Sequence, residues 1–143
     1  STRSMEGASY SLKVPTQASR IEAYTGVNPD ELTEQISHAH RLLLMAEKNL
    51  NLTRQLQEIK KHELIERRRA ELTAGDGKYT EAALKSYAIA HDEYTAAIIA
   101  VDESDAERIG LEVEHKALKT RMTVLLKEAS LARDEQFYNR QKQ

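Results

Sequence analysis

The chain has 143 residues, of which 40% are hydrophobic, 5% aromatic and 31% charged, and its formal net charge is -2. This length suffices for one domain, but the apolar fraction is low for a globular core. The abundance of Ala, Leu, Glu, Lys, Arg and Gln favours long helices that bury a stripe of side chains. Because the charges nearly balance, nucleic-acid binding would require a local basic patch.

The sequence contains no cysteine, which excludes a disulfide framework and a thiolate zinc site and fits a reducing compartment. No apolar run approaches the roughly 18 to 20 residues that cross a bilayer, and no segment has the pattern of a signal peptide. We therefore expect a soluble, cytoplasmic protein.

Residues 1–27 are predicted to form a flexible N-terminal arm. The part up to Arg20 is rich in Ser and Thr, contains Pro15 and shows no helical period. One stretch alternates apolar and polar side chains, namely Tyr10, Ser11, Leu12, Lys13 and Val14. This alternation is typical of an extended segment that could lie on a neighbouring subunit, and simple disorder is the alternative.

The segment Asn28-Pro29-Asp30-Glu31 predicts the start of a first helical arm that runs to Leu72. Asn is a preferred N-cap, Pro is favoured at the first helical position, and acids suit the first turn. An apolar stripe follows, made of Leu32, Ile36, Ala39, Leu43, Ala46, Leu50, Leu52, Leu56, Ile59, Ile65 and Leu72. The stripe shifts after Leu50, which indicates packing against more than one partner helix.

The segment Ala74-Gly75-Asp76-Gly77-Lys78 predicts a chain reversal between two helical arms. Its glycines tolerate the positive φ that ends a helix, and Asp76 can bond its own backbone. A second arm, Thr80 to about Tyr138, would then run antiparallel to the first. Residues 28–140 are thus predicted to form one all-α domain, a long helical hairpin with coiled-coil-like packing.

The second arm carries two apolar seams that differ in phase. The seam residues expected to mediate oligomerisation are Leu84, Tyr87, Tyr94, Ile98, Val101, Leu111, Leu118, Met122 and Leu125. The slip between Val101 and Leu111, together with the capping-box pattern Ser104-Asp105-Ala106-Glu107, predicts a kink or break near Asp102. Since two offset seams exceed what one hairpin can cover, we expect a homo-oligomer.

No arrangement of residues supports catalysis. The nucleophile and phosphate-loop motifs are missing, and Gly75-Asp76-Gly77-Lys78 is too short for a phosphate loop. His38 and His40 lie two positions apart, so they point in different directions on a helix and do not form a metal pair. We therefore expect no metal, no cofactor and no enzymatic activity.

Charge segregation is the most informative feature. The basic residues near the predicted turn are Arg54, Lys60, Lys61, Arg67, Arg68, Arg69 and Lys78. Acids dominate instead from Asp92 to Glu114. In a hairpin centred near Asp76, the basic segment would lie opposite roughly residues 83–98 and overlap only the start of the acidic stretch. Much of the basic cluster would then stay free to contact a phosphate backbone, or to dock on an acidic protein.

The spacing of Lys60-Lys61, Arg67 and Gly75-Asp76-Gly77, followed by a long helix, resembles the UvsY-like phage recombination mediators. The resemblance covers roughly residues 36–138. It implies an all-α protein that assembles into rings, binds single-stranded DNA, and helps load a RecA-type recombinase onto strands covered by single-strand-binding protein. It places DNA contact on Lys60, Lys61 and Arg67, and a phage-encoded protein would act in the host cytoplasm.

Two hypotheses of different classes follow. The first is an oligomeric, non-enzymatic mediator that binds single-stranded DNA through its basic end and holds partner proteins elsewhere. The second is a helical-hairpin adaptor that binds only protein, similar in outline to the FliJ-type export chaperones. In the second hypothesis the basic cluster docks on an acidic partner.

Overall fold

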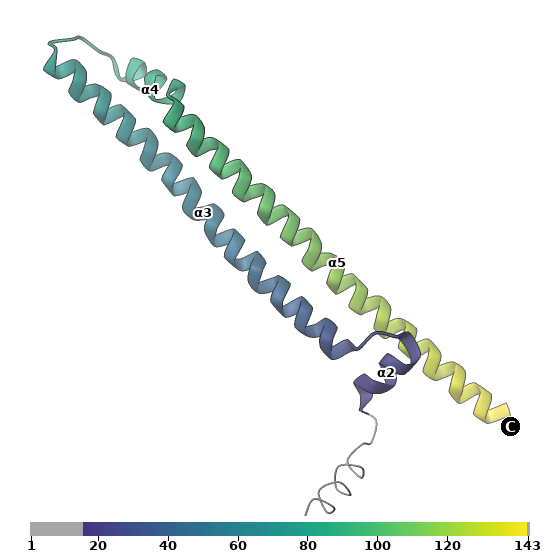
Figure 1. Ribbon diagram of the computed structural model, residues 1–143. Coiled ribbons are helices and arrows are strands. Elements are labelled where there is room, and N and C mark those ends of the chain that lie inside the picture. Colours follow the sequence, from purple (N-terminus) through teal and green to yellow (C-terminus); the bar gives the residue numbers. More distant parts are fainter. Residues whose placement is uncertain (1–15, 143) are drawn as a thin grey trace, which may run out of the picture. The chain divides into compact units, whose positions relative to one another are not determined.

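The computed structural model describes residues 16–142, which contain four helices (Figure 1). They are α2 (Gln17–Thr25), α3 (Pro29–Ala74), α4 (Glu81–Ala90) and α5 (Asp92–Lys142). The described residues form two compact units: unit 1 comprises residues 16–38 and 115–142, and unit 2 comprises residues 39–114. The predicted all-α class is confirmed. The alternating stretch Tyr10 to Val14 lies outside the described residues.

Unit 1 contains a helix that the sequence reading missed. The expected flexible arm is wrong over α2, which begins at the N-cap Thr16 and ends at Gly26. The Thr16 side chain accepts a hydrogen bond from the backbone N–H of Ser19 at 3.1 Å, and Gly26 takes a φ of 76° that only glycine adopts readily. Ile21 anchors this helix in the core of unit 1.

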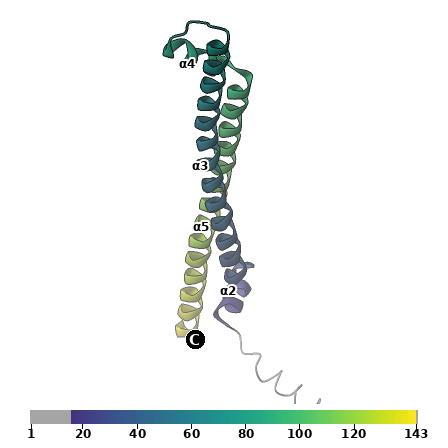
Figure 2. The same ribbon diagram turned by 90° about the vertical axis from the view of Figure 1, so that its left-hand side faces the viewer.

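Helix α3 begins as predicted. The Asn28 side chain accepts a hydrogen bond from the backbone N–H of Asp30 at 2.9 Å, and Pro29 occupies the first helical position. In unit 1 its first turns lie beside α2 (Figure 2). The core there contains Ile21, Leu32, Leu125 and Ala129.

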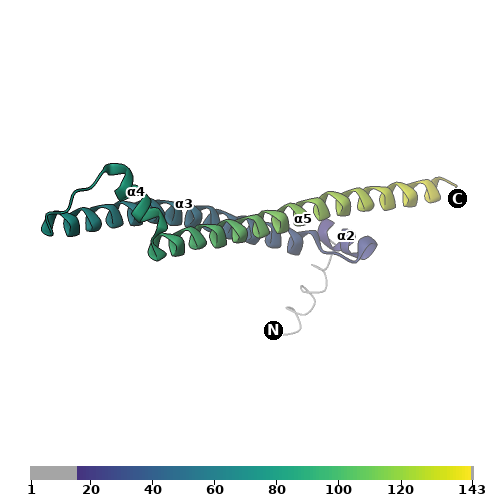
Figure 3. The ribbon, with the colours of Figure 1, turned by 90° about the horizontal axis from the view of Figure 1, so that it is seen from above.

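In unit 2, the remainder of α3 and the first part of α5 are antiparallel and lie side by side (Figures 1 and 3). The predicted register is supported by two cross-helix hydrogen bonds, from Gln57 to the Tyr94 hydroxyl at 3.1 Å and from Asn49 to the Ser104 hydroxyl at 3.3 Å. Nearer the turn, a second core is formed by Leu64, Ile65, Leu84, Ala88 and Tyr94.

The reversal after α3 is a Schellman motif in which aspartate takes the left-handed position. Asp76 has a φ of 55°, and the Gly77 N–H donates to the Leu72 carbonyl at 2.7 Å. The expectation that the flanking glycines carry the positive φ is therefore wrong. A Cβ added to Gly77 would lie 3.2 Å from the same carbonyl oxygen, which is closer than most Cβ contacts, so a side chain at this position requires a small shift of its neighbour.

The second arm is broken, but not where predicted. Thr80 caps α4 by accepting from the Ala83 N–H at 3.1 Å, and α4 ends at His91, whose backbone is extended. The His91 ring then caps α5, since its Nδ1 accepts from the Glu93 N–H at 3.1 Å. His91 therefore ends α4 through its extended backbone and caps the start of α5 through its side chain.

The predicted kink near Asp102 is wrong, because α5 runs through it without interruption. The inner face continues from Val101 through Ser104 and Arg108 to Leu111 at helical spacing. Ser104 is only 7% exposed and receives the Asn49 hydrogen bond. A polar layer therefore fills the gap between the two apolar seams, so the helix need not bend.

Among residues 16–142, none of the four helices combines the length and the apolar character that a bilayer-spanning helix requires.

Candidate nucleic-acid interface

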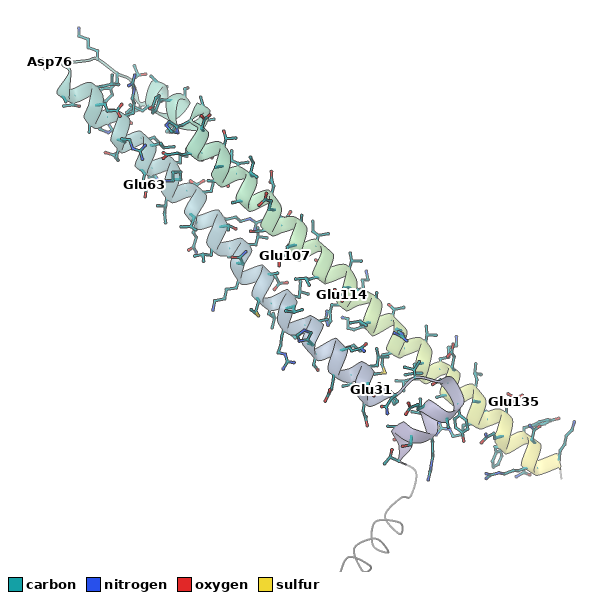
Figure 4. The ribbon with its side chains drawn as sticks, viewed as in Figure 1. Glu31, Glu63, Asp76, Glu107, Glu114 and Glu135 are labelled. Atoms are coloured by element: carbon teal, nitrogen blue, oxygen red, sulfur yellow. The ribbon has the colours of Figure 1, made fainter. Side chains whose placement is uncertain are left out.

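The predicted basic cluster occupies the last turns of α3 and the turn that follows them in unit 2. Figure 4 labels Asp76 at this turn and Glu63 on the preceding stretch of α3. Arg54 and Arg67 are exposed, and Lys60, Lys61, Arg68 and Arg69 are partly buried. Lys78 follows the turn and is exposed. The seven predicted side chains therefore belong to one stretch of the hairpin.

Most of this cluster is paired with carboxylates. Arg67 lies 3.0 Å from Glu93 on α5, and Arg68 lies 3.3 Å from Glu71 one turn away. Lys60 lies 3.0 Å from Glu63 on α3. The prediction that much of the cluster stays free is wrong for these three cations, because acids within α3 itself supply two of the three partners.

Arg69 has the most extensive pairing. Its guanidinium donates to both carboxylate oxygens of Glu81, at 2.6 Å and 3.0 Å, and lies 3.4 Å from Glu66. The hydrogen bond from Arg69 holds the pKa of Glu81 below its ordinary value, and the same hydrogen bond raises the pKa of Arg69. This two-point contact fastens the start of α4 to the end of α3.

Aromatic rings lie beside two of these arginines. The Arg68 guanidinium carbon is 4.8 Å from the centre of the Tyr87 ring, and that of Arg69 is 5.7 Å from the centre of the Tyr79 ring. Tyr79 is 37% exposed. Arginine beside an accessible aromatic face is the combination that single-stranded nucleic acid uses for phosphate contact and base stacking.

Three of the predicted cations form no ion pair within the part of the chain that the structure describes, namely Arg54, Lys61 and Lys78. They are the cations that a polyanion could contact without displacing a carboxylate. The cluster therefore combines unpaired cations with arginines that have exchangeable partners.

The acidic stretch of α5 is partly self-neutralised by its one arginine. Arg108 lies 2.9 Å from Asp105 and 2.8 Å from Glu112, and the hydrogen bond to Asp105 is the main cause that raises the Arg108 pKa. Apart from Glu93, no carboxylate of this stretch forms an ion pair with the basic cluster among the described residues. The two charged segments are thus largely separate, as predicted.

The predicted oligomerisation residues fall into three groups by exposure. Leu84, Tyr94 and Leu125 are at most 8% exposed within one chain, so they form its core, and an interface that preserves this fold must use other residues. Ile98 is exposed, at 36%. The remainder are partly buried, namely Tyr87, Val101, Leu111, Leu118 and Met122.

Leu52, Leu56 and Ile59, to which the predicted stripe of α3 shifts after Leu50, are each at least 51% exposed within one chain. The structure also reveals a site that the sequence does not predict. Three arginines outside the basic cluster, Arg20, Arg133 and Arg140, line one cavity of unit 1. The excess of basic over acidic residues after His115 was the available sequence signal for that cavity.

Within the described range 16–142, no group of three or more His, Asp or Glu side chains is arranged so that it could hold a metal ion. His38 and His40 are both exposed on α3.

Comparison of the chain with known protein families, with curated proteins and with solved structures found no match.

Proposed function

We propose that the protein is a non-enzymatic recombination mediator that assembles as an oligomer, binds single-stranded DNA at the basic end of its hairpin, and helps load a RecA-type recombinase. The observation that carries the proposal is the arginine cluster at residues 67–69, in which Arg69 lies beside the exposed ring of Tyr79 and Arg68 beside the partly buried ring of Tyr87. Its cations suit phosphates and its rings suit bases, whatever their sequence.

The ion pairs within the cluster are compatible with this role. Arg67 and Glu93 keep 47% and 44% of their side-chain surface exposed. Exposed pairs of this kind contribute only about 0–1 kcal/mol, because water screens them. A phosphate can therefore replace the Glu93 carboxylate at small cost, and the displaced acid returns to water.

Exposed apolar side chains on both long helices of unit 2 support assembly. On α3 they are Leu44, Met45, Leu52, Leu56 and Ile59, and on α5 they are Ile99, Ile109 and Val113. Scattered exposed apolar residues are ordinary, but these recur along each helix at near-helical spacing. A second copy that covers them would place several arginine clusters in one particle, which strengthens binding to a continuous strand.

The test is fluorescence anisotropy of labelled oligothymidine at several salt concentrations, after light scattering has given the mass of the assembly. For single strands, log affinity should fall against log salt with a slope of about 0.7 per phosphate neutralised. The variant Arg67→Ala with Arg68→Ala should bind more weakly and lower that slope by about 0.7 per cation removed.

The matched control is Arg41→Ala with Lys48→Ala, which removes the same charge from exposed positions of α3 outside the cluster. The control should keep most of the affinity. Equal losses in both double variants, or no binding at low salt, would contradict the proposal.

A protein-only adaptor similar to the FliJ-type chaperones is the second candidate. It is favoured by the carboxylates that already occupy Arg67, Arg68 and Arg69. The exposed apolar side chains would then bind a partner helix. This candidate predicts no length-dependent binding of oligothymidine in the same titration.

A further inference from the structure

Unit 1 contains a cavity of about 810 Å³ between α2 and the C-terminal part of α5. A hydrogen bond joins the two walls of the cavity: the Tyr24 hydroxyl on α2 donates to the Gln136 side chain on α5 at 2.9 Å. The cavity is therefore formed by two helices that contact each other directly.

The charged side chains that the described residues contribute to the cavity lining are all positive. Arg20 comes from α2, and Arg133 and Arg140 come from α5 two turns apart on one face. None of the three forms an ion pair with another residue of the range 16–142. No carboxylate among residues 16–142 lines the cavity, which distinguishes it from the basic cluster of unit 2.

The rest of the lining combines polar groups, from Gln17, Ser130 and Gln136, with an apolar part. Ile21 and Ala129 are 9% and 8% exposed, and Leu126 is 49% exposed. Phe137 lies at the same cavity with 64% of its surface exposed. Such a lining favours a large apolar side chain, whereas the arginines favour carboxylates in two-point contact.

We propose that this cavity, hereafter the arginine groove, binds an acidic peptide segment of a partner protein that carries at least one large apolar side chain. The apolar side chain contacts Ile21, Leu126 and Phe137. The carboxylates of the segment pair with Arg20, Arg133 and Arg140. This site would act in addition to the proposed DNA contact in unit 2 and does not depend on it.

Other occupants fit the groove less well. A nucleic-acid strand would match the cations and the aromatic rings, but the aliphatic Ile21 and Leu126 give its bases no ring to stack on. The chain's own residues 1–15 carry Arg3 and Lys13 against one acid, Glu6, so their charge does not complement the groove. A second copy of the chain could offer the acidic stretch of its α5. Two carboxylates of that stretch, Asp105 and Glu112, are already paired with Arg108.

The test uses the full chain and a fluorescein-labelled peptide in which a run of aspartates precedes a Leu-Phe pair. Two comparison peptides replace either the aspartates by lysines or the Leu-Phe pair by serines. The proposal predicts saturable binding of the first peptide, and binding at least about tenfold weaker for each comparison peptide. Equal binding of the serine peptide would overturn it, because charge alone would then suffice.

The variants locate the site. Arg133→Ala with Arg140→Ala should weaken peptide binding by at least about tenfold, and Phe137→Ala, at an exposed position, should also weaken it. Lys116→Ala with Lys119→Ala removes the same charge from exposed positions of α5 outside the groove and should change binding little. Circular dichroism checks that each variant keeps its helices.

Three further results would overturn the proposal. The first is an equal loss of peptide binding in the Lys116 and Lys119 variant. The second is displacement of the peptide by oligothymidine, with the same dependence on Arg133 and Arg140, which would assign the groove to nucleic acid. The third is absence of peptide binding together with a fall in assembly mass in the Arg133 and Arg140 variant, which would assign the groove to a second copy.

Discussion

Two consecutive segments of α3 have similar periodicity but pack in opposite ways. From Ala39 to Leu50 the residues of the predicted stripe face inward, and Leu43 and Leu50 are 8% and 3% exposed. In the next segment the inward positions are polar, as with Gln57, which bonds the Tyr94 hydroxyl. The leucines there precede the inward positions by one residue, so they are rotated by about 100° and remain exposed.

This difference teaches that an apolar stripe on a helix does not by itself identify the surface buried within the chain. In the first segment the stripe forms the seam with the chain's own α5. In the second, Leu52, Leu56 and Ile59 are available for another molecule. The intramolecular contact there is held by polar groups that satisfy each other, which is specific but less stabilising.

The largest effect on stability is expected in the first segment. Leu50→Ala removes a buried side chain and leaves a cavity, which should lower the free energy of unfolding by about 2–5 kcal/mol. Urea unfolding followed by circular dichroism measures this change. A loss below about 1 kcal/mol would show that Leu50 does not stabilise the contact between α3 and α5 within one chain.

In the second segment the opposite pattern is expected. Leu52→Gln with Leu56→Gln should change the unfolding free energy of the isolated chain by no more than about 0.5 kcal/mol per site, since both side chains are about half exposed. The mass of the assembly measured by light scattering should fall. An unchanged mass would remove these leucines from the proposed interface, and a large loss of stability would place them in the core.

Much of the fold could be predicted from local signals. The cap at Asn28, the stripe from Leu32 to Leu50 and the reversal at Asp76 depend on neighbouring residues, and all are present. The break near Asp102 was predicted because the apolar residues change phase there. The prediction failed because Ser104 continues the inner face as a buried polar residue, which an apolar pattern cannot reveal.

The helix α2 and the candidate site show other limits. Thr16 and Gly26 are ordinary cap residues, but the Ser and Thr content of the preceding segment masked them. The distribution of charged residues along the sequence predicts the basic cluster. The carboxylates that pair with it depend on side-chain geometry. Glu71 reaches Arg68 from within one helix, and Glu93 reaches Arg67 only because two helices pack in a particular register.

The most direct test of the proposed DNA contact removes those partners and leaves the arginines in place. Glu71→Gln with Glu93→Gln should free Arg68 and Arg67, so oligothymidine should bind more tightly, with a salt slope steeper by up to about 0.7 for each cation that gains a phosphate. Glu47→Gln with Glu114→Gln, at exposed positions of unit 2 away from the cluster, controls for the change in net charge. If the first variant binds oligothymidine no more tightly than this control, the arginines at the end of α3 are not the DNA contact.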